Sequence, residues 1–332
     1  MAVKIKTFLC GLLITAVPMV AAVRQTNASE NARHNTTGFW NEPVDIASRN
    51  LFYGPGGPAH QPHGPYTFVK EDLKGSNPKF VVRDRDGVKW KVKLGVEAQP
   101  ETVATRLVWA AGYFANEDYF LPDFRAANMP ARLHRGQKLI APDGSMHNVR
   151  LKREDEKKVG DWKWRQDPFT GTRAWNGLRV MMALINNWDL KDSNNSDYRD
   201  GDSVKIYLVS DLGASFGTSS AHWPLWKAKG NLDSYSHSKF IRSSTPTTVS
   251  FYVPGRPAFY WMVWPRNYCM RLHLRWIGQD IPRADAHWIG ALLSHLSDGQ
   301  IHDAFRAAGY SAAEADGFSK IVERRIALLD RL

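Results

Sequence analysis

Two short segments of this chain carry residue types suited to phosphoryl transfer. Residues 187–194 read Asn-Trp-Asp-Leu-Lys-Asp-Ser-Asn and place an acid, Asp189, five positions before an amide, Asn194. Residues 207–213 read Tyr-Leu-Val-Ser-Asp-Leu-Gly and place a second acid, Asp211, at the end of an apolar strand. Such a set can hold Mg²⁺ ions and a hydroxyl acceptor around a triphosphate. The alternative is that both segments are ordinary turns, in which Asp, Ser and Asn cap backbone amides.

The elements that would position these residues occur in order in the N-terminal half. Alternating strands are expected over 67–72, 80–84 and 88–94, and an amphipathic helix over 101–112. Lys93 ends the third strand and Glu101 opens the helix, so the two can form the ion pair that orients a nucleotide's phosphates. The ordinary alternatives are a solvated strand lysine and an acid that complements the helix dipole.

The connection between the first two strands, residues 73–79, reads Leu-Lys-Gly-Ser-Asn-Pro-Lys. Its backbone N–H groups at Gly75, Ser76 and Asn77 could bind phosphate oxygens, and Gly75 would permit their close approach. The same composition is also typical of a simple turn.

The order of these motifs resembles the protein-kinase-like superfamily, and the short Gly-Ser-Asn-Pro-Lys loop is closer to its atypical branches, the HipA-type and phosphoinositide kinases. The resemblance covers about residues 64–330. It implies an α+β, two-lobed fold in which a small antiparallel-sheet N-lobe with one helix precedes a mainly helical C-lobe. It also implies ATP and Mg²⁺ as cofactors and a transferase activity on a hydroxyl-bearing acceptor.

The resemblance also implies a role for each candidate residue. Asp189 would be the catalytic aspartate that acts on the acceptor hydroxyl, and Lys191 would contact the transferred phosphate. The family resemblance also implies Glu97 as the fallback partner of Lys93. The donor would be held by Gly75, Ser76, Asn77, Lys93 and Glu101, and the metal by Asn194 and Asp211.

The chain also departs from that pattern. Asn187-Trp188 replaces the usual His-Arg before the catalytic acid, Leu212 replaces Phe, and no Ala-Pro-Glu signature follows. The acceptor is therefore left open, and a catalytically inactive nucleotide- or glycan-binding envelope protein is an alternative. Tryptophans in the runs 162–164, 223–226 and 261–264 could stack on sugars, or pack in the core.

A serine hydrolase is the second alternative. Residues 213–217, Gly-Ala-Ser-Phe-Gly, match the G-x-S-x-G pattern around Ser215, and a later acid and histidine would complete a triad. That pattern requires a helix directly after the serine, whereas residues 218–224 read as a loop. The candidate partners are Asp280 or Asp285 and His287 or His295.

The N-terminus predicts export. Lys4 and Lys6 precede an apolar stretch over 8–20 that ends in small residues, which is typical of a signal peptide over 1–22. We expect a secreted or periplasmic protein with no further membrane span, an irregular leader over 23–64, an N-lobe over 65–156 and a C-lobe over 157–332. Export conflicts with the usual location of ATP, which is cytoplasmic.

Charge and cysteine content restrict the partners. The net charge of +11 favours anionic partners, including an anionic acceptor, and no nucleic-acid recognition motif accompanies it. Cys10 lies in the expected signal peptide, so the mature chain would keep only Cys269 and form no internal disulfide.

Overall fold

Strands whose side chains alternate between apolar and basic build the N-terminal sheet. In Lys89–Lys93 the apolar side chains Trp90 and Val92 are buried, and the lysines project from the opposite face. Met146–Arg153 continues the alternation, since Val149 and Leu151 are buried and alternate with Arg150 and Lys152. The apolar face closes a core of its own, made of Phe80, Val82, Trp90, Val92, Leu94, Tyr119, Phe124, Leu133, Met146, Val149 and Leu151.

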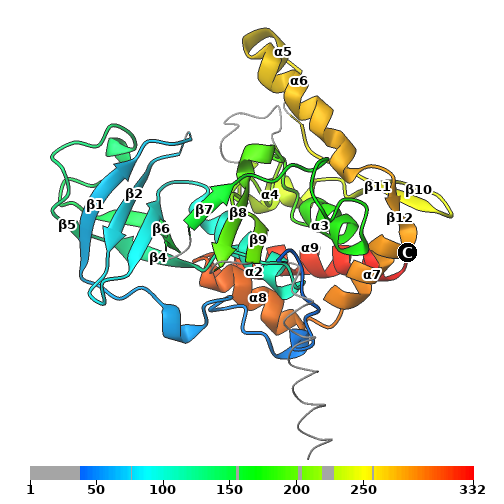
Figure 1. Ribbon diagram of the computed structural model, residues 1–332, viewed down its shortest axis with the longest axis horizontal. Helices are drawn as coiled ribbons and strands as arrows, with labels where there is room; N and C mark the ends of the chain where they lie inside the picture. Colours follow the sequence, from blue (N-terminus) through cyan, green and yellow to red (C-terminus); the bar gives the residue numbers. More distant parts are fainter. Residues whose placement is uncertain (1–37, 76, 155–156, 201–203, 219–227, 256–257) are drawn as a thin grey trace, which may run out of the picture. The chain divides into compact units, whose positions relative to one another are not determined.

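The sheet has six strands in the order β4-β6-β3-β2-β1-β5 (Figure 1). Its pairings are antiparallel except for the parallel pair of β1 with β5. The strands are β1 (Tyr66–Asp72), β2 (Lys79–Arg83), β3 (Lys89–Lys93), β4 (Asp118–Phe124), β5 (Ala126–Ala127) and β6 (Met146–Arg153).

One long helix, α2 (Ala98–Ala110), packs against β4 and β6 of this sheet. It begins three residues before the expected start at 101, because Pro100 is tolerated in a first helical turn. Almost all of its residues are buried, since α2 also contacts α8 (Asp298–Ala307). The helix therefore joins the sheet to the helical part of the chain.

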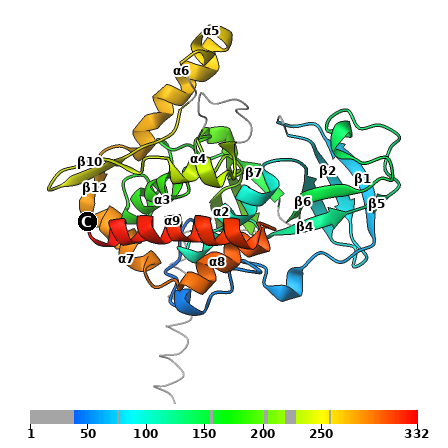
Figure 2. The ribbon, with the colours of Figure 1, turned by 180° about the vertical axis from the view of Figure 1, so that it is seen from behind.

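The rest of the chain is mainly helical and shares one large apolar core (Figures 1 and 2). Capping boxes at Ser297 and Ser311 begin α8 and α9. The helices are α3 (Arg173–Leu184), α4 (Leu232–Ser236), α5 (Tyr260–Val263), α6 (Pro265–His273), α7 (Arg283–Leu293), α8 and α9 (Ala312–Asp330). Two small sheets accompany the helices. One is formed by β7 (Lys157–Gly160), β8 (Asn195–Asp200) and β9 (Val204–Val209), and the other by β10 (Ile241–Ser244), β11 (Thr248–Phe251) and β12 (Ile281–Pro282).

The expected fold class is confirmed: an antiparallel sheet with one helix precedes a mainly helical part, in an α+β arrangement. The computed structural model describes residues 38–75, 77–154, 157–200, 204–218, 228–255 and 258–332. The expected signal peptide and the leader up to residue 37 lie outside the described residues. Within them, no helix combines the length and the apolarity needed to cross a bilayer.

The described part of the expected leader, residues 38–64, contains only short 3-10 turns besides isolated bridges. It is nevertheless packed onto the main core through Phe39, Ile46 and Leu51, which are buried. The indole N–H of Trp40 donates to the carbonyl of Ala111 at 2.8 Å, just beyond the end of α2.

A buried acid at the start of β4 ties the sheet to α2. Asp118 is fully buried and accepts from Arg106 at 3.1 Å, Arg150 at 3.4 Å and Thr105 at 3.1 Å. Asp118→Ala would leave the buried guanidinium of Arg106 without a carboxylate, so we expect the free energy of unfolding to fall by about 3–5 kcal/mol.

The matched control is Asp123→Ala in the same strand, because the Asp123 side chain is 80 % exposed and pairs only with His147. Its cost should stay below about 1 kcal/mol. Urea unfolding of both variants measures the difference, and equal losses would contradict this role of Asp118.

Candidate functional site

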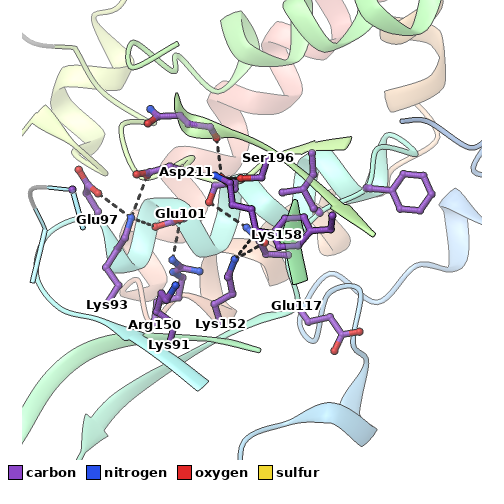
Figure 3. Close-up of a pocket in the computed structure, with 18 of the residues that line it drawn as sticks. Lys91, Lys93, Glu97, Glu101, Glu117, Arg150, Lys152, Lys158, Ser196 and Asp211 are labelled. Atoms are coloured by element: carbon purple, nitrogen blue, oxygen red, sulfur yellow. Dashed lines mark hydrogen bonds and ion pairs between the residues drawn. The ribbon is translucent and has the colours of Figure 1, made fainter. Parts of the chain in front are cut away.

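The ammonium group of Lys93 lies among three carboxylates (Figure 3). Its Nζ is 2.6 Å from Glu101 Oε2, 3.1 Å from Glu97 Oε2 and 3.2 Å from Asp211 Oδ1. One oxygen from each of the three acids lies within 4.8 Å of the others. Like-charged carboxylates at this spacing repel one another, so the ammonium is what allows them to be ionised together.

Local structure explains why these residues meet. Lys93 is the last residue of β3, and Glu101 lies in the first turn of α2. Glu97 precedes Glu101 by four residues, and side chains at that spacing lie on one face of a helix. The sequence offered Glu97 and Glu101 as alternative partners of Lys93, and the structure pairs Lys93 with both.

Further cations balance the cluster. Arg150 on β6 contacts Glu101 Oε1 at 3.0 Å from Nη2, while its Nη1 contacts Asp118. Lys229 pairs with Glu97 Oε1, and the side-chain amide of Asn77 donates to Glu97 Oε2. Each buried acid thus has at least one cationic partner, as burial of a charge requires.

The pKa values follow from this arrangement. Burial works against ionisation of Asp211, but Lys93 outweighs it and holds the pKa of Asp211 below its ordinary value. Burial is likewise outweighed at Glu97 by Lys93 and Lys229, which lower its pKa. At Glu101 burial dominates over Arg150 and Lys93, and the pKa is raised. Asp211 is therefore a carboxylate at neutral pH.

The two motifs that follow α3 are locked together by backbone hydrogen bonds. The carbonyl of Asn194 accepts from the N–H groups of Ser210 at 2.8 Å and Asp211 at 3.2 Å. The side-chain amide of Asn194 donates to the carbonyl of Asp189 at 2.5 Å. Asn194 therefore holds the Asp189 loop beside the Asp211 loop.

Asp189 is held by two cations. Its Oδ1 lies 3.0 Å from Arg271 Nη2 on α6, and its Oδ2 lies 3.3 Å from Lys191 Nζ. Asn187 Oδ1 accepts from the N–H of Asp189 at 2.9 Å, and the buried ring of Trp188 lies under the Arg271 guanidinium at 4.7 Å. The unusual Asn187-Trp188 pair thus shapes the loop and packs against Arg271.

A cleft of about 1490 Å³ brings most of the candidate residues together. It places them around one space that a substrate could enter. The position of Ser76 lies outside the described residues. The candidates that line the cleft are Gly75, Asn77, Lys93, Glu101, Asp189, Lys191, Asn194 and Asp211, with Glu97 beside them.

Two oxygens in this cleft suit a hard cation. Asp211 uses Oδ1 for Lys93 and the N–H of Gly213, whereas its Oδ2 has no hydrogen bond or ion pair within the described part of the chain. The same holds for Oδ1 of Asn194, whose amide nitrogen is committed to Asp189. Mg²⁺ typically binds one or two protein oxygens and completes its shell with water and phosphate. Asp211 and Asn194 therefore fit a Mg²⁺ site.

Three cations of the site were missed by sequence reasoning. Arg150 lies in a strand whose apolar residues at 149 and 151 alternate with basic ones. This alternation predicts a basic face of the strand, but it does not predict which acids that face contacts. Lys229 and Arg271 come from irregular structure and from α6, and no local pattern relates them to Glu97 or Asp189.

The geometry around Ser215 does not form a nucleophilic triad. Ser215 is fully buried, and its hydroxyl has no hydrogen-bond partner in the residues that the structure describes. His295 Nδ1 is instead directed to the carbonyls of its own helix, at Ala291 and Leu292. The G-x-S-x-G match is thus not accompanied by a triad in the described part of the chain.

The cluster generates a prediction about pH. In Lys93→Met the three carboxylates lose their shared cation, so at least one of them should have a folded-state pKa above its unfolded value of about 4–4.5. The folded state then binds more protons than the unfolded state, and stability falls as pH rises through that window. We expect the stability deficit of the variant to grow by about 1–3 kcal/mol between pH 5 and pH 8.

Lys91→Met is the matched control, since Lys91 lies on the same strand but pairs with the partly exposed acids Asp72 and Glu154. Its deficit should be similar at both pH values. Thermal unfolding at pH 5 and pH 8 measures both, and a deficit of Lys93→Met that does not change with pH would refute the shared-cation interpretation.

Comparisons with known proteins show likeness to solved structures only. No family model matches the chain, and no curated protein matches it. Among solved structures, the chain is similar to the Helicobacter pylori proinflammatory kinase CtkA, with a TM-score of 0.48 and 12 % sequence identity over 81 % of this chain and 98 % of that one. At this level of similarity the function has to be argued from the residues of the site.

Proposed function

We propose that this protein is an atypical, kinase-like phosphotransferase that transfers a phosphoryl group from ATP·Mg²⁺ to a hydroxyl acceptor. The observation that carries the proposal is the convergence of the Lys93–Glu101 ion pair with Asp189, Asn194 and Asp211 on one cleft. Positioning and charge neutralisation are what phosphoryl transfer requires of a protein, and this cleft supplies fixed charges for both.

On the donor side, Lys93 would contact the phosphates, steadied by Glu101 and Glu97. The loop at Gly75 and Asn77 forms the adjoining wall of the cleft, and Gly75 has a φ of +70°, which a larger residue rarely adopts. Asp211 and Asn194 would hold Mg²⁺, which when bound neutralises charge on the phosphates. The lowered pKa of Asp211 keeps this ligand ionised.

On the acceptor side, Asp189 would orient the hydroxyl and accept its proton. The acceptor oxygen forms a bond to the γ-phosphorus, the bond from that phosphorus to the bridging oxygen breaks, and ADP leaves. Lys191, 3.3 Å from Asp189, would neutralise charge on the phosphoryl group in transit.

The cleft favours anionic molecules. Among its lining residues, thirteen are Lys or Arg and eight are Asp or Glu. This excess suits a nucleoside triphosphate and also an acceptor that carries its own negative charge. We further propose export of the chain, from its N-terminal sequence, which would require a donor supply outside the cytoplasm.

A catalytically inactive nucleotide-binding protein is the second candidate. The ion pair between Asp189 Oδ1 and Arg271 favours it. This ion pair engages one of the two carboxylate oxygens that would otherwise be available to the acceptor hydroxyl. Among the tryptophans considered for sugar stacking, Trp162 and Trp164 are buried, so a glycan-binding role would rest on the exposed Trp261 and Trp264.

Metal-dependent binding tests the donor side. Asp211→Asn keeps the size of the side chain but removes its charge, so affinity for ATP·Mg²⁺ should fall at least about 100-fold, because charge-assisted metal–phosphate contacts are lost. Ser215→Ala should leave the affinity unchanged. Isothermal titration calorimetry with and without Mg²⁺ measures both. Unchanged affinity in Asp211→Asn would exclude this metal site, and labelling of Ser215 by a fluorophosphonate would favour the hydrolase.

Asp189→Asn separates catalysis from binding. Asp189 is assigned to the acceptor, so the variant should bind ATP·Mg²⁺ normally while phosphoryl transfer falls by about 10²–10⁴, the usual contribution of a general base. The control is Asp192→Asn in the same loop, because asparagine keeps the oxygen that accepts from the N–H of Trp164. A radiolabelled-phosphate assay measures transfer. Background transfer by the wild type and the variant alike would establish the inactive alternative.

A further inference from the structure

Exposed aromatic side chains gather at one place in the described chain, residues 259–264, which we call the aromatic tip. Its large apolar side chains are 42–74 % exposed, and Trp261 and Trp264 are the two tryptophans most open to solvent among the described residues. Elsewhere the exposed large apolar residues are scattered singly, as is normal for a protein surface. The exposed members of the tip are Phe259, Trp261, Met262, Val263 and Trp264.

The tip is an ordered projection. Figures 1 and 2 show α5 and α6 extending away from the other helices of residues 38–332 in both views. The N–H of Trp264 donates to the carbonyl of Tyr260 at 2.8 Å, and that of Met262 to Phe259 at 3.1 Å. The rings of Tyr260 and Trp264 lie 5.7 Å apart. Backbone and ring contacts thus hold the apolar side chains in an outward-facing turn.

The sequence around the tip carries charge of one sign. Residues 234–279 contain no Asp or Glu, and Arg266, which is exposed, lies two residues after the tip. Aromatic side chains settle at the headgroup level of a bilayer, and nearby cations are attracted to anionic lipids. The basic residues of this acid-free segment are Lys239, Arg242, Arg256, Arg266, Arg271 and Arg275.

We propose that the aromatic tip docks the protein onto the surface of an anionic lipid bilayer. Trp261 and Trp264 insert at the level of the headgroups, and Arg266 lies against lipid phosphates. The contact is peripheral and reversible, because α5 has only four residues and a small buried area needs electrostatic support.

Docking would also orient the cleft. Arg271 lies seven residues after Trp264, about 10 Å along the chain of α6, and it contacts the carboxylate of Asp189. The wall of the cleft next to Asp189 would therefore lie close to the bilayer. The docking itself does not depend on the proposed phosphotransferase activity, so either proposal can fail alone.

Vesicle flotation tests the docking. The experiment uses residues 38–332, which form one compact unit, so that the apolar N-terminal stretch does not contribute, and the full chain alongside. Vesicles of phosphatidylcholine alone are compared with vesicles in which about a third of the lipid is phosphatidylglycerol. We expect binding to the anionic vesicles that weakens as salt is raised and is at least about tenfold weaker to neutral vesicles.

Variants locate the contact. Trp261→Ser with Trp264→Ser should weaken binding to anionic vesicles at least about tenfold, and Arg266→Glu should weaken it severalfold. The matched controls are Val44→Ser, at a side chain that is 91 % exposed, and Arg85→Glu in the hairpin turn between β2 and β3. Both controls should bind as the wild type does, and all variants should keep its thermal midpoint.

Cys269 supplies a second readout, because it is exposed on α6 and is the one cysteine within 38–332. An environment-sensitive dye on Cys269 should brighten and shift to the blue with anionic vesicles. The proposal is overturned if the wild type does not bind the anionic vesicles, or if the double tryptophan variant floats with them as well as the wild type does. It is also overturned if sedimentation shows that the tip mediates self-association while the vesicles leave the dye fluorescence unchanged.

Discussion

The ion pairs of one buried lysine hold the candidate site together. Lys93 ends a strand, Glu97 and Glu101 begin the helix that follows, and Asp211 comes from a loop more than a hundred residues later. Each of these acids is near another acid, and the ammonium is the one cation in the described residues that contacts all three, so it offsets their mutual repulsion. The junction between the sheet and the helical part therefore depends on electrostatic neutrality as much as on apolar packing.

The ion pairs of Lys93 also affect how a phosphate ligand would bind in the cleft. The Lys93 ammonium is committed to three carboxylates, so a phosphate that contacts it must share it with Asp211, the most exposed of them. A cation brought by the phosphate would offset that competition, because it offers Asp211 a replacement partner. Binding of the anion and of the metal should thus be coupled through Asp211, which is the linkage expected when two ligands use one group.

Local pattern explains how much of this could be predicted. Strand alternation located Lys93, the apolar run at 207–209 located Asp211, and the helix expected from 101 favoured Glu101 as the partner of Lys93, with Glu97 as the fallback. The helix begins at Ala98 instead, one residue after Glu97, and Lys93 contacts both glutamates. Arg150, Lys229 and Arg271 were beyond reach for another reason: their contacts depend on tertiary packing of segments 49 to 132 residues from their partners.

Arg271 connects helix α6 to the loop that carries Asp189. Its guanidinium donates to the carbonyl of Trp188 at 2.8 Å, stacks on the ring of Trp188 and pairs with Asp189, so a single side chain of α6 fixes the loop that carries the proposed acceptor-orienting acid. Because the aromatic tip directly precedes α6, docking of the tip would bear on the helix that holds Asp189. A small shift of α6 would lengthen the 3.0 Å pair with Asp189 and free its Oδ1 for a hydroxyl group. If the tip docks as proposed, contact there and the freedom of Asp189 Oδ1 would be coupled through α6.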